Sequence, residues 1–89
     1  MDYFEISINA LKLDPYKDID EVKVHHFIIR KMYLKGEAET KATLTEIAEG
    51  TNLTIKRVRR IVEKLEDMQI LQVVKGVGKS PNSYRVFNK

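Results

Sequence analysis

Basic residues gather in one short stretch of this chain, where their side chains can bind phosphate groups. The stretch holds four of them within five positions: Lys56, Arg57, Arg59 and Arg60. Acidic residues come mostly later, whereas the helix macrodipole alone would favour acids first and bases last. A phosphate backbone is therefore the simplest explanation of the order. A charged helix face that is merely solvated is the ordinary alternative.

Apolar residues in the same stretch predict that these bases lie on a helix. They recur at spacings of three and four: Ile55, Val58, Ile61, Val62 and Leu65. At about 100° per residue, all of them fall within roughly 60° of Val58, which predicts one buried face. Lys56 and Arg60 lie on the opposite side, and the other two arginines lie on the flanks. Thr54 is the expected N-cap of this helix.

A shorter amphipathic run precedes the basic helix and completes a helix-turn-helix pattern. This run contains Ile47 and Ala48, and Ala48 is small where the two helices would touch. Leu53 fills the turn. Asn52 stands where glycine is commonest, and Asn tolerates a positive φ angle. Two helices joined by a tight turn, the second one basic, are typical of a helix-turn-helix, whose second helix enters the major groove with its N-terminal part.

The hydrophobic pattern changes to a period of two after Met68, which predicts a β-hairpin. Residues 70–74 read as one strand, residues 75–83 as a turn, and residues 84–87 as the returning strand. A hairpin directly after a recognition helix is a wing. Its tip carries Lys75 and Lys79 with the small polar residues Ser80, Asn82 and Ser83. Such a tip can reach a phosphate or a minor groove, although an ordinary solvated loop has the same composition.

The first half of the chain is expected to form a helix on which the helix-turn-helix packs. Residues 18–21 form a plausible capping box for a helix that runs to about Lys35 and ends at Gly36. We expect this helix to be buried by the next two, because it is apolar around much of its circumference: Val24, Phe27, Ile28, Met32, Tyr33 and Leu34. Residues 37–41 are a polar loop or a short ladder strand. A second capping box at residues 43–46 opens the helix-turn-helix.

Residues 1–19 are set apart from the winged helix-turn-helix domain, which we place at residues 20–89. Phe4, Ile6 and Ile8 alternate with polar residues, as in a short strand. The Asp14–Pro15 pair breaks whatever precedes it. The segment is an edge strand, an arm packed on the core, or a dimer contact.

Composition is that of one small globular domain. The 89 residues have a net charge of +3 and no cysteine. Residues 1–53 carry seven Lys and Arg against ten Asp and Glu, whereas residues 54–89 carry nine against three. The basic second half predicts a face for a polyanion. Neither a membrane span nor a signal peptide is visible, so we expect a cytoplasmic protein.

The chain resembles winged helix-turn-helix domains over about residues 20–87. It is similar to MarR-like regulators and to the N-terminal domains of RepA-N and DnaD-type replication initiators of Gram-positive plasmids and phages. The matching runs begin at Leu44 (Leu-Thr-Glu-Ile-Ala), Thr54 (Thr-Ile-Lys-Arg-Val), Val62 (Val-Glu-Lys-Leu-Glu-Asp-Met-Gln-Ile-Leu) and Gly78 (Gly-Lys-Ser-Pro-Asn-Ser-Tyr). The long flanking helices through which MarR-like proteins dimerise are not seen, which counts against that subfamily. The resemblance implies an α+β, mainly α fold of three helices plus a C-terminal hairpin wing.

Signals for other chemistry are weak. Residues 76–80 (Gly-Val-Gly-Lys-Ser) resemble the end of a P-loop, but Val73 stands where the full pattern needs glycine and Pro81 follows. His25 and His26 are adjacent and would point about 100° apart on a helix, unlike zinc ligands at i and i+4. We find no catalytic constellation and expect neither an enzyme nor a cofactor or metal.

The leading hypothesis is binding to double-stranded DNA, in transcription regulation or in replication of a plasmid, phage or other mobile element. The predicted DNA-binding residues are Thr54, Lys56, Arg57, Arg59, Arg60, Lys64, Lys75, Lys79, Ser80 and Asn82. A protein-interaction module without DNA binding is the alternative, and a homodimer or a protein partner fits both. Single-stranded DNA binding is a minor alternative, because Tyr84 and Phe87 are better explained as core residues of the wing.

Overall fold

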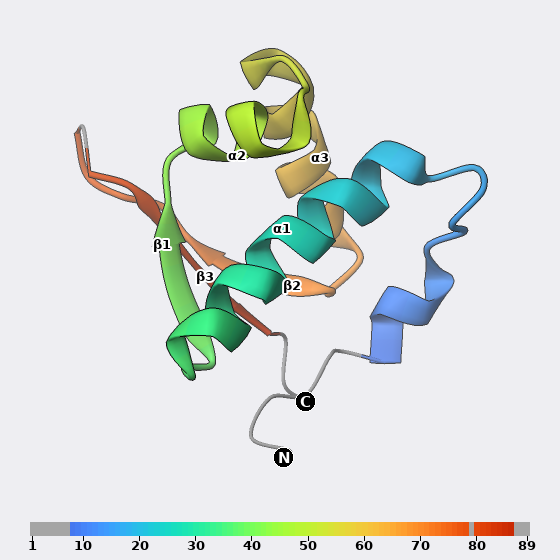
Figure 1. Ribbon diagram of the computed structural model, residues 1–89, viewed down its shortest axis with the longest axis horizontal. Coiled ribbons are helices and arrows are strands. Elements are labelled where there is room, and N and C mark those ends of the chain that lie inside the picture. The colour runs from blue at the N-terminus through green and yellow to red at the C-terminus, as the bar shows by residue number, and fades with distance from the viewer. Residues whose placement is uncertain (1–7, 79, 87–89) are drawn as a thin grey trace.

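Three α-helices and a three-stranded antiparallel sheet form an α+β, mainly helical fold (Figure 1). The computed structural model describes residues 8–78 and 80–86, with side chains for residues 10–78 and 80–85. The elements follow in the order η1 (Ile8–Lys12), α1 (Ile19–Lys35), β1 (Glu39–Ala42), α2 (Leu44–Thr51), α3 (Ile55–Asp67), β2 (Leu71–Val74) and β3 (Asn82–Val86). This is the predicted winged helix-turn-helix arrangement, with α2 and α3 as the helix pair and β2–β3 as the wing. No described helix is both long and apolar enough to cross a membrane.

Helix α1 begins and ends where the sequence predicts, with Asp18 at its N-cap position, but its start lacks the predicted capping hydrogen bonds. Gly36 adopts a left-handed conformation (φ 69°), and its N–H donates to the Tyr33 carbonyl at 3.1 Å. The predicted capping box at residues 18–21 is wrong, because the Asp18 carboxylate does not cap α1. It accepts a hydrogen bond from the Asp14 N–H at 2.9 Å, which lowers the pKa of Asp18. The Asp18 carboxylate also lies 3.5 Å from the Lys64 ammonium of α3.

The predicted capping and turn at α2 are confirmed. Glu46 N–H donates to Thr43 Oγ1 at 3.0 Å, and Thr43 N–H donates to Glu46 Oε1 at 2.9 Å. This backbone hydrogen bond lowers the pKa of Glu46. Asn52 takes the left-handed conformation (φ 60°), and Leu53 N–H reaches the Ala48 carbonyl at 3.0 Å. The two helices of the pair therefore meet at the turn that the sequence predicts.

Helix α3 buries most of its predicted face. Thr54 caps it by accepting the Arg57 N–H at 3.1 Å. The buried residues of α3 are Val58, Ile61, Val62 and Leu65. Ile55 was expected on the same face but is 43% exposed. Ile55 is the first residue of the helix. The helical angle predicts the direction of its side chain, but it does not predict whether the neighbouring helices extend far enough along the axis of α3 to cover it.

The sheet has the strand order β1–β3–β2 and is antiparallel throughout. Residues 39–42 form β1, so the ladder-strand alternative for residues 37–41 is the correct one, with Thr40 opposite Tyr84. β3 begins at Asn82, two residues earlier than predicted, because β3 pairs with both neighbours: Ser83 lies opposite Lys41 on one side and Val74 on the other. Phe87 lies outside the described residues.

One core joins the helices and the sheet. Its fully buried members include Val24, Ile28 and Met32 of α1, and Tyr84 of β3 is also 0% exposed. Tyr33 and Leu34, which were expected to be buried, are 58% and 66% exposed. A helix of 17 residues is longer than the two helices and short strands that pack on it, so its last turn keeps an uncovered side.

The described part of the N-terminal segment packs on the same core. Leu13 is buried with the residues of α1. Asp14 turns the chain towards α1, because its carboxylate accepts the Tyr16 N–H at 2.8 Å. Ile8 opens the 3₁₀ helix η1, so the predicted strand does not include it. Residues 1–7, which carry the rest of that strand pattern, lie outside the described residues.

Candidate nucleic-acid interface

Three of the predicted cations of α3 form no ion pair with any described residue. Lys56, Arg59 and Arg60 are exposed. Six ion pairs join described residues, and none of the six involves these three side chains. They lie in the first two turns of α3, directly after the turn that joins it to α2. Their charges are therefore available to an anion approaching the N-terminal half of the helix.

Two other predicted cations of α3 pair with acids of α1. Arg57 Nε donates to Asp20 Oδ2 at 3.1 Å. Lys64 Nζ lies 3.0 Å from Glu21 Oε2, and this hydrogen bond raises the pKa of Lys64. Residues 18–21 thus form an acidic end of α1 that packs beside α3. Sequence reasoning missed these pairs because the partners are 37 and 43 positions apart.

Asn82 has a structural role in the wing. Its Oδ1 accepts the Gly76 N–H at 3.0 Å, and its Nδ2 donates to the Tyr84 hydroxyl at 3.2 Å. Burial raises the pKa of that tyrosine. A Cβ at Gly76 would collide with the backbone carbonyl of Ser80, so only glycine lets the two sides of the hairpin approach so closely. Asn82 and Gly76 together fix the shape of the wing.

The helix and the wing share a groove of about 220 Å³. It is lined by Leu44, Arg59, Val62, Glu63, Glu66, Lys75, Gly76 and Asn82. Arg59 of α3 and Lys75 of the wing therefore border one concave surface, although they are 16 positions apart. Glu63 and Glu66 line it further along α3, so a polyanion is attracted to the first turns of the helix and repelled by the later ones.

The remaining predicted residues differ in their setting. Ser80 is exposed beside the wing tip, and its N–H donates to the Val77 carbonyl at 3.1 Å. Lys79 lies outside the described residues. Thr54 uses its hydroxyl as an acceptor for the helix N-terminus, as predicted. Across residues 8–78 and 80–86, no three acidic or histidine side chains cluster as a metal site would require.

Comparison of the chain with protein-family models, with curated proteins and with solved structures finds no match in any of the three. The function is therefore argued from the residues and their geometry.

Proposed function

We propose that this protein binds double-stranded DNA, with α3 in the major groove and the β2–β3 wing on the adjacent backbone. The observation that carries the proposal is a group of three exposed cations in the first two turns of α3 that pair with no described residue: Lys56, Arg59 and Arg60. A helix-turn-helix presents this part of its second helix to base edges and phosphates. The wing adds Lys75 across the groove that it shares with Arg59.

Each cation has a role that follows from its position. Lys56 and Arg60 lie on the side of α3 opposite its buried face and contact bases or phosphates. Arg59 and Lys75 border the groove beside the wing and hold the backbone, together with Lys79 and Ser80. Arg57 is held by Asp20 in the free protein and exchanges that carboxylate for a phosphate on binding. In this proposal the protein acts in the cytoplasm, in transcription regulation or in replication of a mobile element.

Replacing Arg60 tests the assignment of α3. Arg60→Ala should weaken binding to a preferred duplex by about tenfold. It should also reduce the slope of the logarithm of the binding constant against the logarithm of salt concentration by roughly one. Fluorescence anisotropy across a salt series measures both. Lys12→Ala is the matched control, because Lys12 is an exposed cation of η1 that belongs to neither α3 nor the wing and lines neither described groove. Equal affinities and salt slopes for the two variants would remove Arg60 from the interface.

A further inference from the structure

A second concave surface lies between α1 and α2. The groove is about 480 Å³ and is lined by Lys23, His26, Phe27, Arg30, Gly50 and Thr51. The four residues from α1 follow the spacing of one helix face, at i, i+3, i+4 and i+7. None of the described residues of α3 or of the wing lines it, so it is separate from the proposed DNA interface. We call it the α1–α2 groove.

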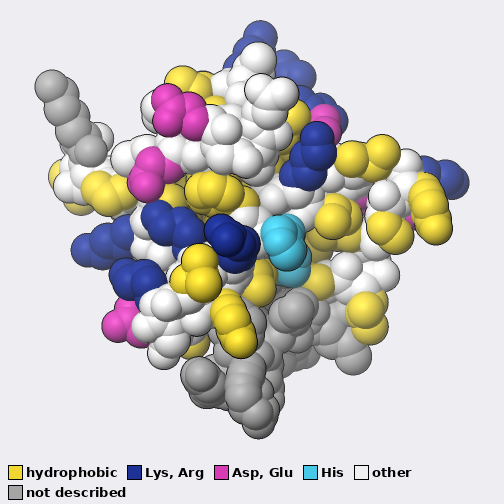
Figure 2. Space-filling model, in the orientation of Figure 1, with side chains coloured by type: hydrophobic (Ala, Val, Ile, Leu, Met, Phe, Trp, Pro, Cys, Tyr) yellow, Lys and Arg dark blue, Asp and Glu magenta, His cyan; other side chains and the backbone are white. Residues whose placement is uncertain are grey.

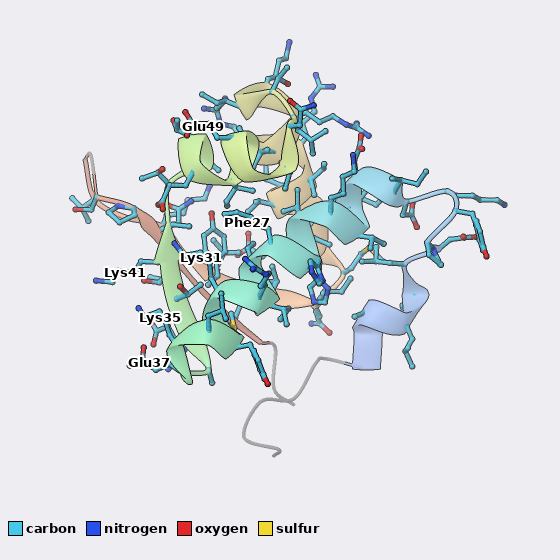
Figure 3. The ribbon with its side chains drawn as sticks, in the orientation of Figure 1. Phe27, Lys31, Lys35, Glu37, Lys41 and Glu49 are labelled. Atoms are coloured by element: carbon cyan, nitrogen blue, oxygen red, sulfur yellow. The ribbon has the colours of Figure 1, made fainter. Side chains whose placement is uncertain are left out.

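The floor of the groove depends on a glycine inside a helix. Phe27 points from α1 towards α2 (Figure 3), and a Cβ at Gly50 would collide with its ring. Gly in a helix interior costs about 0.5–1 kcal/mol relative to Ala. Alanine does not fit at Gly50 in this arrangement, because the Phe27 ring packs directly on the α2 backbone. The ring is only partly buried there, so an aromatic surface remains at the bottom of the groove.

The rim of the groove carries two cations, Lys23 and Arg30, that form no ion pair with another described residue. Lys23, His26 and Arg30 are exposed, and none of the described residues that line the groove is acidic. The neighbouring lysines of α1 differ, because Lys31 pairs with Glu46 and Lys35 pairs with Glu37. Figure 2, which looks onto α1, shows basic side chains around the histidine, with hydrophobic side chains among them. The rim therefore offers two positive charges that are not engaged in ion pairs within the described part of the chain.

We propose that the α1–α2 groove binds an acidic segment of a partner protein, with an apolar side chain of that segment seated on Phe27. The carboxylates of the segment would meet Lys23 and Arg30 on the rim. An apolar anchor fits the aromatic floor, because buried apolar contacts at the centre of an interface supply most of the binding energy. A DNA duplex keeps its bases stacked inside and has no projecting apolar side chain that could be seated on Phe27, so the groove favours a peptide.

The location of the groove would allow the domain to bind the partner segment and DNA together. A segment held by α1 and α2 leaves the exposed side of α3 and the wing uncovered. Partner and DNA therefore bind at the same time, and the domain links the partner to DNA. Binding of the acidic segment does not itself require DNA binding, so the two proposals can fail independently.

Selection of peptides by the protein itself tests the proposal. A phage library of random dodecapeptides is selected on the full chain, and an enriched peptide is labelled for fluorescence anisotropy. The expected consensus joins Asp or Glu to an aromatic or aliphatic residue. The double variant Lys23→Glu/Arg30→Glu should bind the peptide at least about tenfold more weakly, since two favourable charge contacts become repulsive. Both positions are exposed, and thermal unfolding followed by circular dichroism checks that the variant is folded.

The matched control is Lys12→Glu/Lys17→Glu, which makes the same change in net charge at exposed residues outside the groove. This control should retain peptide binding. An enriched consensus without acidic residues, or equal binding by both double variants, would overturn the proposal. So would a larger loss of duplex DNA binding in the groove variant than in the control, which would assign the face to DNA. A groove-dependent dimer in sedimentation equilibrium would assign it to a second copy of the chain and overturn it equally.

Discussion

At the scale of single residues, the availability of a cation is decided by distant neighbours. Arg57 and Arg60 have similar sequence surroundings, but Arg57 pairs with Asp20 and Arg60 pairs with no described carboxylate. Helical periodicity predicts the direction in which each points, and this prediction is confirmed for the exposed side of α3. The periodicity of α3 does not predict the ion pair between Arg57 and Asp20, because Asp20 lies on α1. The two arginines are consequently expected to contribute differently to DNA binding.

His25 gives a prediction about pH at the same scale. Its Nε2 is buried without a hydrogen-bond partner among the described residues. Burial, with a smaller effect of the His26 charge, lowers the pKa of His25 below the ordinary value of 6.5. The unfolded chain therefore binds the proton more readily than the folded one. The free energy of unfolding should be highest above pH 6.5 and should fall as the pH drops below it.

Urea unfolding between about pH 5.5 and 7.5 measures this effect, because histidine is the main side chain that titrates there. His25→Gln should remove most of the pH dependence. His26→Gln, at the exposed neighbouring position, should retain most of it. The same slope in His25→Gln as in the unaltered chain would contradict the account.

At the scale of elements, local signals are sufficient for most of the helix boundaries. The Thr43 capping box, the Thr54 cap and the left-handed Asn52 and Gly36 all depend on residues within a few positions, and all are confirmed. The capping box at Asp18 fails because Asp14 and Lys64 compete for the same carboxylate. The early start of β3 also escaped prediction, since it depends on pairing with β1 some 40 positions away.

The contact between α1 and α3 predicts a restraint on DNA binding. Asp20→Asn removes the charge that holds Arg57 at 3.1 Å and also removes a nearby charge that repels phosphates. Affinity for duplex DNA should rise by about three- to tenfold. The stability of the fold should change little, because the pair is partly exposed.

Glu37→Gln is the control for Asp20→Asn. It removes the same charge from an exposed residue after α1, whose partner is Lys35 rather than a residue of α3. Anisotropy titrations of both variants at one salt concentration make the comparison. A rise in affinity that is equal in the two variants would mean that only net charge matters, and the specific restraint on Arg57 would be rejected.

At the scale of the whole molecule, the fold places the acidic first half and the basic second half of the chain side by side. The acidic end of α1 neutralises part of α3, and the remaining cations of α3 lie on its exposed side and towards the wing. A separate cationic groove lies between α1 and α2. The sequence is sufficient to predict that the exposed side of α3 is basic, because charge counts and helical periodicity are local properties. The second surface was not predicted, because it depends on Phe27 and Gly50 meeting across two helices.

Binding of the unaltered protein to random duplex and single-stranded DNA across a salt series, from about 50 to 300 mM, tests the central claim most directly. We predict that duplex binding is the stronger and that its logarithm falls linearly with the logarithm of salt concentration. The slope should correspond to about four released counterions, from the unpaired cations of α3 and from the wing. Weak binding to every DNA, with little dependence on salt, would contradict the account and leave the α1–α2 groove as the functional surface.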